Sequence, residues 1–340
     1  MRKQKVVYIF DRSYVGRMLT VTNSILQNEK KELADSIEFY LTYFGLARDR
    51  EQILRKCMAH FPNNKFHFRH VPSELPDLFK KYEEAYNYES SAKHIQTSSV
   101  LARFDLDEIW PEITDKFVYL DLDLIVKGSI SELFDSADKE SLISACRSNE
   151  RLFTELRSYR QGYSDPAQIK YYDYTSEFRD NFKLIYDNYR ITKSLSAVSA
   201  EAFDYFSNKE FDLTAPSLNA GVFVLNVEKY RKDKNLKRNI RFLIQLNSTG
   251  DLLRYNDQSI LNFAFYGKIS WIDQEWNRLD YGWENIEREE EVKEQFEDAK
   301  IIHYNGWRKP WSLLHNFPGL IDVPEYFIPG VRLWEKYQII

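Results

Sequence analysis

Short strand-like runs alternate with helical patterns through the first third of the sequence. We expect strands at 5–10, 37–43 and 65–70, and helices at 16–28 and 53–59. A β-α-β-α order is typical of a mainly parallel sheet whose faces are covered by helices. The sequence therefore predicts a protein of the α/β class.

A further apolar run, KFVYL at 116–120, is expected to lie centrally in that sheet. It ends directly before Asp121. In open α/β sheets the ligand crevice lies beyond the carboxyl ends of the strands. We therefore expect the chemistry of the protein to take place at Asp121.

The rest of the chain is less regular. Helical patterns cover 78–110, 228–246 and 256–265, and further strands are expected at 222–227 and 300–303. The stretch 135–216 carries a cluster of tyrosines and charges that suits a lid or an acceptor platform, and its fold stays open. No repeat or Gly/Ser-rich linker separates two domains, so one domain with an inserted region is the simpler organisation.

Charge and cysteine content exclude several classes of protein. The 47 Lys and Arg residues against 52 Asp and Glu residues leave a net charge of −5, so no basic surplus indicates a nucleic-acid partner. Cys57 and Cys146 are too few for a disulfide scaffold or a cysteine-built zinc site. The longest apolar-leaning stretch without a charge, 213–227, is too short to span a membrane. We expect a cytoplasmic protein with at most peripheral association at the inner face of the membrane.

Asp121 and Asp123 form a carboxylate pair directly after the central strand. On an extended backbone, residues two apart face the same side, so one cation can contact both. Hard divalent cations prefer such oxygen ligands and commonly bridge protein carboxylates to substrate phosphates. The same tripeptide occurs at Asp105 and Asp107 inside a helical stretch, so spacing alone does not separate a metal site from a solvated acidic turn. The preceding strand is what favours Asp121 and Asp123.

Two further segments carry candidate residues, one that begins at the expected strand ending in His303 and one around Asn219. His303 ends the expected strand at 300–303, and an imidazole there can complete a mixed oxygen and nitrogen shell, although a single histidine is more often a core residue. Lys309 offers a point cation for phosphate, and Gly306 lets the backbone approach a ligand. Asn219 stands among small residues at a strand entrance and offers a donor and an acceptor to sugar hydroxyls, or it belongs to an ordinary turn.

Two sites on helices stay open between function and structure. Asp257 and Gln258 lie in a segment that also resembles a plain helix N-cap. Arg103, before the central strand, can reach a diphosphate or pair with Asp105 or Asp107 at the surface.

Taken together and in this order, these segments resemble family 8 glycosyltransferases, which are retaining enzymes of the GT-A (nucleotide-diphospho-sugar transferase) fold. The matching stretches are VVYIFDRSYV, SSVLARF, KFVYLDLDLIVKGSISELF, LNAGVFVLNVEKYR, NDQSILNFAF and IIHYNGWRKPW. They cover most of the chain except its middle and about the last thirty residues. The resemblance implies a GT-A domain at 1–311 with an inserted lid or acceptor region at about 136–217, and a C-terminal extension at 312–340.

The resemblance also implies a role for each candidate residue. Asp121, Asp123 and His303 would bind Mn²⁺, with Mg²⁺ as the alternative. Donor-binding positions would be Asp11, Arg103, Asp121, Asn219, Gly306 and Lys309. Gln258 would lie nearest the anomeric carbon, with Asp257 beside it. Arg12 and Ser13 depart from the Asp and Asn that family members often carry after Asp11, and Trp307 and Arg308 are bulkier than the usual residues.

The activity that the resemblance implies is metal-dependent transfer of a hexose, glucose or galactose, from a UDP-sugar. The acceptor would be a saccharide, a lipid-linked glycan or a glycoprotein. Two alternatives remain. One is an inactive sugar-nucleotide or glycan-binding pseudo-enzyme. The other is a haloacid dehalogenase-like phosphatase, because YLDLDLIV is close to the motif that begins those enzymes.

Overall fold

A computed structural model gives the arrangement of the chain. It describes residues 3–86, 98–155, 211–212, 214–249, 253, 255–279, 296–305, 309–312 and 328–339. Within these residues a seven-stranded sheet has the order β3-β2-β1-β4-β7-β6-β8. Four of its six neighbouring strand pairs are parallel, which confirms the predicted mainly parallel sheet.

The first half of the chain follows the expected alternation closely. Its elements are β1 (Lys5–Phe10), η1 (Arg12–Tyr14), α1 (Val15–Asn28), α2 (Lys31–Ala34), β2 (Glu38–Tyr43), α3 (Asp49–His60), β3 (Lys65–His70), α4 (Val71–Glu74) and α5 (Pro76–Tyr86). The 3₁₀ helix η2 (Ser98–Phe104) and the helix α6 (Leu106–Ile109) precede β4 (Lys116–Leu120). β4 is fully buried and occupies the middle of the seven strands, as predicted.

The second half begins at β5 (Leu124–Val126), α7 (Ile130–Ser136), β6 (Ile143–Arg151) and η3 (Leu152–Glu155). It continues with β7 (Pro216–Asn226), α11 (Val227–Lys232), α12 (Lys234–Thr249), α13 (Asp257–Ala264), β8 (Ile269–Trp271), η5 (Gln274–Asn277), β9 (Arg278–Leu279), β10 (Ile301–His303) and α16 (Ile328–Tyr337). The expected inserted region at 136–217 lies mostly outside the described residues.

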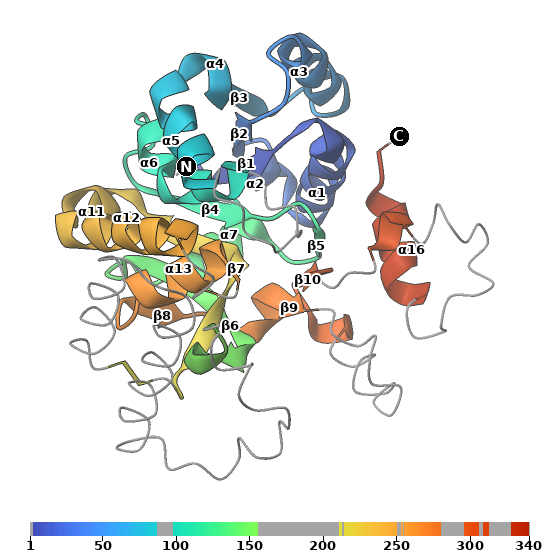
Figure 1. Cartoon of the computed structure of the whole chain (residues 1–340). Coiled ribbons are helices and arrows are strands. Elements are labelled where there is room, and N and C mark those ends of the chain that lie inside the picture. The colour runs from blue at the N-terminus through green and yellow to red at the C-terminus, as the bar shows by residue number, and fades with distance from the viewer. Residues whose placement is uncertain are drawn as a thin grey trace.

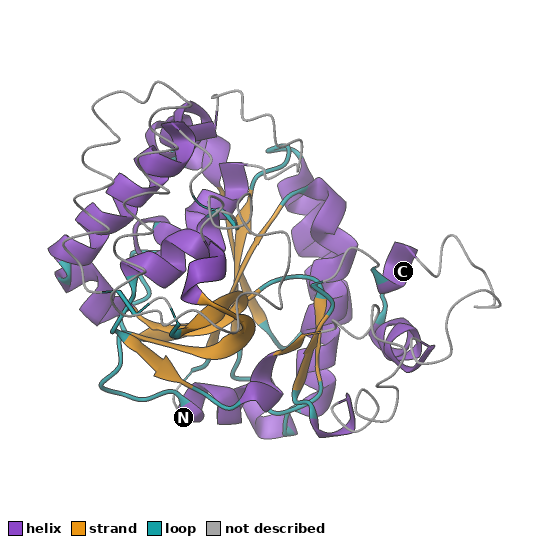
Figure 2. Cartoon of the chain, turned by 60° about the horizontal axis from the view of Figure 1, so that its bottom comes forward, coloured by secondary structure: helices purple, strands orange, loops and turns teal. Residues whose placement is uncertain are grey.

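Helices cover both faces of the large sheet. α1 and α3 lie on one side, and α5, α11 and α12 lie on the other (Figure 1), and Figure 2 shows helices on both sides of the strands. Because successive residues of a strand face opposite sides, Val6 and Tyr8 pack in one core and Val7 packs in the other. Burial of these two large cores is the main source of stability for such a sheet.

The structure corrects the sequence expectations in three places. Asn219 and its small neighbours lie inside β7, which begins at Pro216, and not at the entrance of a shorter strand. The expected helix at 228–246 is two helices, because Asp233 ends α11 and its side chain accepts a hydrogen bond from the Leu236 N–H in the first turn of α12. Asn256 occupies the N-cap position of α13, but its side chain does not cap the helix and its φ is +54°.

A second, three-stranded sheet has the order β5-β10-β9. β10 pairs antiparallel with β5 and parallel with β9. α16 packs against this sheet through a small core that contains Ile302, Tyr304 and Trp334, and it also contacts α1. Among the described helices, none is long and apolar enough to cross a membrane.

Candidate active site

Asp121, Asp123 and His303 come together at the point where the two sheets meet. Asp121 follows β4, Asp123 precedes β5, and His303 ends β10. Each offers one ligand atom, and these three atoms all lie within 4.8 Å of one another. The structure therefore brings together the three side chains that the sequence analysis selected as metal ligands.

Strand pairing explains how residues so far apart in sequence meet. His303 is paired with Leu124 in the antiparallel β5–β10 ladder, so it lies beside Asp123. The Tyr304 N–H donates to the Asp123 carbonyl over 2.7 Å, which continues this ladder past the end of the strands. The small sheet therefore fixes Asp123 and His303 to each other through the backbone.

Gly221 provides the space in which Asp121 and His303 meet. The Asp121 N–H donates to the Gly221 carbonyl over 2.8 Å, because β7 is the antiparallel neighbour of β4. A Cβ on residue 221 would lie 2.2 Å from His303 Cε1 and 2.9 Å from Asp121 Oδ2. Only glycine leaves this cradle open, and two carboxylates with one imidazole are a ligand set that Mn²⁺ or Mg²⁺ accepts. The residues present therefore fit a divalent cation.

The charges around Asp123 keep it ionised. Burial of Asp123 opposes ionisation, but His303 and Lys309 outweigh that effect and hold the pKa of this carboxyl far below its ordinary value. Lys309 Nζ lies 2.7 Å from Asp123 Oδ2, and His303 Nε2 lies 3.1 Å from Asp123 Oδ1. Lys309 thus lies beside Asp123, one of the expected metal ligands, and its expected role toward phosphate stays a prediction.

Arg103 is buried and points into the site, so it does not pair with Asp105 or Asp107 at the surface. Its guanidinium lies 2.6 Å from Asp257 and 3.4 Å from Asp121. Burial raises the pKa of Asp257 in spite of this ion pair, and the negative charge of Asp121 adds to the rise. The arginine therefore links Asp121, an expected metal ligand, to the helix α13.

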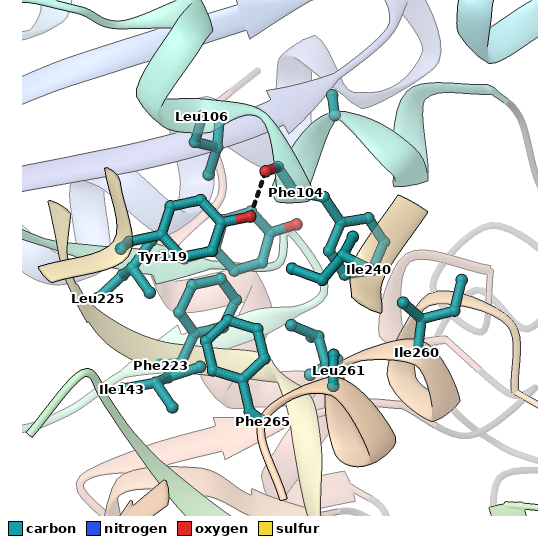
Figure 3. Packing of buried hydrophobic residues seen from close by; sticks show 14 of the residues in the cluster. Phe104, Leu106, Tyr119, Ile143, Phe223, Leu225, Ile240, Ile260, Leu261 and Phe265 are labelled. Carbon is teal, nitrogen blue, oxygen red and sulfur yellow. Dashed lines mark hydrogen bonds between the residues drawn. The ribbon is translucent and has the colours of Figure 1, made fainter. Parts of the chain in front are cut away.

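Tyr119 supports Asp121 from the core. Its hydroxyl donates to Asp121 Oδ1 over 2.8 Å and accepts from Arg103 over 3.1 Å. Its ring stacks on Phe223 with a centroid distance of 4.7 Å, within the core shown in Figure 3. Burial raises the pKa of Tyr119 well above its ordinary value, so the hydroxyl remains a donor.

The side-chain amides of Gln258 and Asn219 face each other. The Asn219 side-chain amide and the Ala220 N–H both lie 3.4 Å from Gln258 Oε1. Gln258 Nε2 donates to Glu155 Oε1 over 3.0 Å, and Glu155 is fully buried. Ser259 and Asn262 also donate to this carboxylate. Asp257, Gln258 and Asn219 are thus brought to the same side of the site.

Asp11 directly follows β1, the parallel neighbour of β4. Its carboxylate accepts hydrogen bonds from the N–H and the hydroxyl of Ser13, at 2.8 and 2.7 Å. Burial raises the pKa of the nearby Tyr14, and Asp123, Asp11 and Asp121 all add to the rise. Tyr14 therefore lies within electrostatic range of all three carboxylates. Gly306 lies outside the described residues.

Sequence reasoning missed Tyr119, Glu155 and Asn277. Asn277 is fully buried, and its side chain contacts both His303 and Asn219. Neither Glu155 nor Asn277 belongs to a recognisable motif, so only the strand pairing reveals them. The small residues around Gly221 were the one signal that pointed to a close approach here.

The other Asp-Leu-Asp sequence, at 105–107, has a structural role. Asp107 is buried and lies 2.5 Å from Lys237, and Asp105 accepts a hydrogen bond from Tyr82 over 2.9 Å. Asp105, Tyr82 and Lys237 line a separate cavity of about 360 Å³ between α5, η2 and α12. Of the predicted site residues that the structure describes, none lines that cavity.

Comparison with known proteins gives a consistent result. The family model described as "Glycosyl transferase family 8" matches residues 5–314. A putative glycosyltransferase of Haemophilus influenzae is 20% identical over 332 residues, which are 94% of this chain and 80% of that protein. The glycosyltransferase 8 domain-containing protein 1 of Danio rerio is 25% identical over 234 residues, which are 67% of this chain and 55% of the longer relative.

Solved structures show the same fold. The galactosyltransferase LgtC, in complex with donor and acceptor sugar analogs, aligns with a TM-score of 0.58 at 17% identity, over 98% of this chain and 95% of that chain. The glycosyltransferase GlyE of Streptococcus pneumoniae aligns with a TM-score of 0.54 at 16% identity, over 100% of this chain and 61% of that chain. The predicted GT-A architecture is thereby confirmed.

Proposed function

This chain belongs to glycosyl transferase family 8, and we propose that it is a metal-dependent, retaining hexosyltransferase. It would transfer glucose or galactose from a UDP-sugar to a glycan or glycoprotein acceptor. The observation that carries the proposal is the convergence of Asp121, Asp123 and His303 within 4.8 Å at the carboxyl end of β4. That edge is where open α/β sheets bind their ligands.

The residues around the three ligands suit a departing diphosphate. A divalent cation held there would offset the negative charge that builds up on UDP, with Mn²⁺ or Mg²⁺ as the ion. Lys309 is positioned to neutralise phosphate charge beside Asp123. Arg103 pairs with Asp121 and Asp257 and holds both in place. Because it is a cation beside Asp121, we also assign it a donor-binding role. Asp11 and Gly306 complete the proposed donor-binding set.

Gln258 and Asp257 would act on the sugar. The Gln258 carbonyl would stabilise positive charge at the anomeric carbon, and Asp257 and Asn219 would orient sugar hydroxyls. The salt bridge to Arg103 holds Asp257 in one orientation. We assign no nucleophile, and the proposal does not choose between attack from the leaving-group face and a covalent intermediate.

The partners follow from this activity. We propose a UDP-sugar donor and a saccharide, lipid-linked glycan or glycoprotein acceptor, with no nucleic acid. We also propose a cytoplasmic location, with at most peripheral contact with the membrane. The domain limits 1–311 and 312–340 stay part of the same proposal.

The phosphatase alternative has less support. It leaves β1, β2 and β3 without a role, although β1 is the parallel neighbour of β4 and Asp11 follows it. The pseudo-enzyme alternative stays open to experiment, because it predicts the same fold and the same three ligands.

A donor hydrolysis screen tests the proposal without a known acceptor. UDP-glucose, UDP-galactose and UDP-N-acetylglucosamine are incubated with the protein and Mn²⁺, Mg²⁺ or a chelator, and released UDP is measured. We expect slow UDP release from one hexose donor that stops with the chelator. Metal-independent glycan binding without any UDP release would instead indicate the pseudo-enzyme, and phosphate release from small phosphomonoesters would indicate the phosphatase.

A further inference from the structure

His303 is held on both sides of its ring by hydrogen-bonding groups. Its Nε2 lies 3.1 Å from Asp123 Oδ1, on the side of the metal ligands. Its Nδ1 lies 3.0 Å from Asn277 Oδ1, on the opposite side. His303 is 2% exposed and Asn277 is 0% exposed, so water does not replace these partners. The group that faces Nδ1 therefore decides whether the ring proton stays on Nδ1, which leaves the Nε2 lone pair free to bind a cation.

A backbone N–H fixes the orientation of the Asn277 amide through a second amide. The Gly221 N–H donates to Asn219 Oδ1 over 2.9 Å, and a backbone N–H is always a donor. Asn277 also contacts Asn219 Oδ1 over 2.9 Å, so the atom that faces it must be the Nδ2 donor. Rotating the Asn277 amide by half a turn would bring two oxygen atoms together at this distance. The Asn277 oxygen must therefore face His303.

A buried carboxylate gives the same orientation from the other end of the chain of amides. Glu155 accepts from Gln258 Nε2 over 3.0 Å, which turns Gln258 Oε1 towards Asn219. Asn219 then offers its Nδ2 to Gln258 and its Oδ1 to Gly221 and Asn277. Two independent groups, a backbone amide and a carboxylate, thus agree on the direction of every amide in the series.

We propose that Asn277 is a positioning residue that accepts the Nδ1 proton of His303 and so keeps the Nε2 lone pair directed at the site of Asp121 and Asp123. This inference rests on the proposed metal site and extends it to a residue that does not touch the metal. Outer partners of metal-bound histidines commonly change metal affinity by about 10- to 100-fold when they are removed. Asn277 is the last amide in the series that runs from Gln258 through Asn219 to His303. It lies one residue before β9, which pairs with β10.

Two substitutions separate the acceptor role from a packing role. Asn277→Ala removes the acceptor, whereas Asn277→Asp keeps an acceptor oxygen for Nδ1 and loses the donor to Asn219. Asn64→Ala is the matched control, since Asn64 is a half-buried asparagine whose side chain donates to the carbonyls of Ala34 and Ile37 and takes no part in the amide series. Thermal unfolding of all variants reports how much each change costs the fold.

The test measures Mn²⁺ affinity by calorimetry with no sugar nucleotide present. We expect Asn277→Ala to weaken Mn²⁺ binding by about 10- to 100-fold. Asn64→Ala should keep the affinity of the parent protein within a few-fold. Asn277→Asp should lie between the parent and Asn277→Ala, because it keeps the acceptor for Nδ1 but places an oxygen against Asn219 Oδ1. In the Mg²⁺-loaded proteins, nitrogen NMR of His303 should show a slowly exchanging Nδ1 proton in the parent and faster exchange in Asn277→Ala.

The outcomes separate this inference from the proposed function. If Asn277→Ala binds Mn²⁺ as the parent does, or if Asn277→Asp loses affinity as severely as Asn277→Ala, the acceptor role is wrong while the metal site stands. If the parent protein itself does not bind Mn²⁺, both the metal site and this inference are wrong.

Discussion

Asp121 and Asp107 show how one residue type in one short sequence takes on different roles. Asp107 is buried against Lys237, which satisfies its charge within the fold. Asp121 remains partly exposed and shares its surroundings with Asp123 and His303. An ion pair between two side chains of the same protein is a structural contact, whereas converging acids around an open glycine can take a ligand. The environment and not the tripeptide decides the role.

Substitution of Asp123 should remove activity without unfolding the protein. We expect Asp123→Ala to lower metal-dependent UDP release by more than about 100-fold, because a ligand matters at least as much as its outer partners. Asp107→Asn is the matched control from the second Asp-Leu-Asp sequence. It should cost about 1–3 kcal/mol of stability by weakening the contact to Lys237, and it should leave metal dependence intact. An Asp123→Ala variant with full metal-dependent activity would remove the proposed site.

Substitution of Gly221 tests the cradle between Asp121 and His303. A methyl group there would overlap His303 and contact Asp121, so we expect Gly221→Ala to reduce Mn²⁺ affinity at least tenfold, about 1.4 kcal/mol. Gly16→Ala in α1 is the control, since a Cβ there meets nothing within 4 Å. The control should keep Mn²⁺ affinity and gain up to about 1 kcal/mol of stability. Equal Mn²⁺ binding by both variants would contradict the cradle.

At the scale of elements, the site depends on very short strands. β10 and β5 have three residues each, and β9 has two. Strands of this length are not stable by themselves. They are held by α16, whose Trp334 packs on Tyr304 next to His303, with ring centroids 5.9 Å apart. The helix α16 therefore packs behind His303, the proposed metal ligand of the small sheet.

Truncation of Trp334 should weaken both the fold and metal binding. Trp334 is 2% exposed, and removal of such a side chain costs about 3–5 kcal/mol. We expect Trp334→Ala to lower the unfolding temperature and to weaken Mn²⁺ binding, because Tyr304 and β10 lose their packing partner. Arg332→Ala, on the exposed side of α16, should change neither measurably. If Mn²⁺ affinity is unchanged in Trp334→Ala, the small sheet does not depend on α16.

At the scale of the whole molecule, the two sheets share the work of fold and function. The large sheet buries two cores, and Asp11 and Asp121 directly follow its strands β1 and β4. Asp123 directly precedes β5 of the small sheet, and His303 ends its strand β10. Acidic groups are also buried away from this junction. Burial raises the pKa of Asp105 to about 6, with further contributions from Glu108 and Asp107, while Tyr82 and Lys237 oppose the rise.

The raised pKa of Asp105 makes a pH-dependent contribution to stability. Between its ordinary value of 3.8 and about 6, the folded state binds more protons here than the unfolded state does. The stability contributed by this group therefore falls as pH rises through that range, and the full cost is present above it. Asp105→Asn removes the cost and keeps an acceptor for Tyr82.

The free energy of unfolding, measured by denaturant titration, checks this prediction. We expect Asp105→Asn to become more stable relative to the parent by about 2–3 kcal/mol between about pH 4 and about pH 8. A difference between the two proteins that does not change with pH would show that Asp105 is ionised in the fold without cost.

Local patterns in the sequence determined the strand and helix order, the central place of β4 and the position of Asp121 at its end. These features follow from hydrophobic periodicity, which a short stretch of residues carries within itself. The resemblance of separated motifs to the family also added His303, Lys309 and Gln258 to the predicted site. Residues 306–308 and most of the region 136–217 lie outside the described residues, so the expectations for them stay predictions.

Only the tertiary structure decided which partners these side chains have. Arg103 pairs with Asp257 and Asp121 because β7 pairs with β4 and α13 packs on β7, and no spacing along the chain contains that information. Asn277, Glu155 and Gly221 owe their importance to pairing between strands and helices that are distant in sequence. A hydrogen bond acts only over about 3 Å, so the fold must bring the two groups together before either residue type has a specific role.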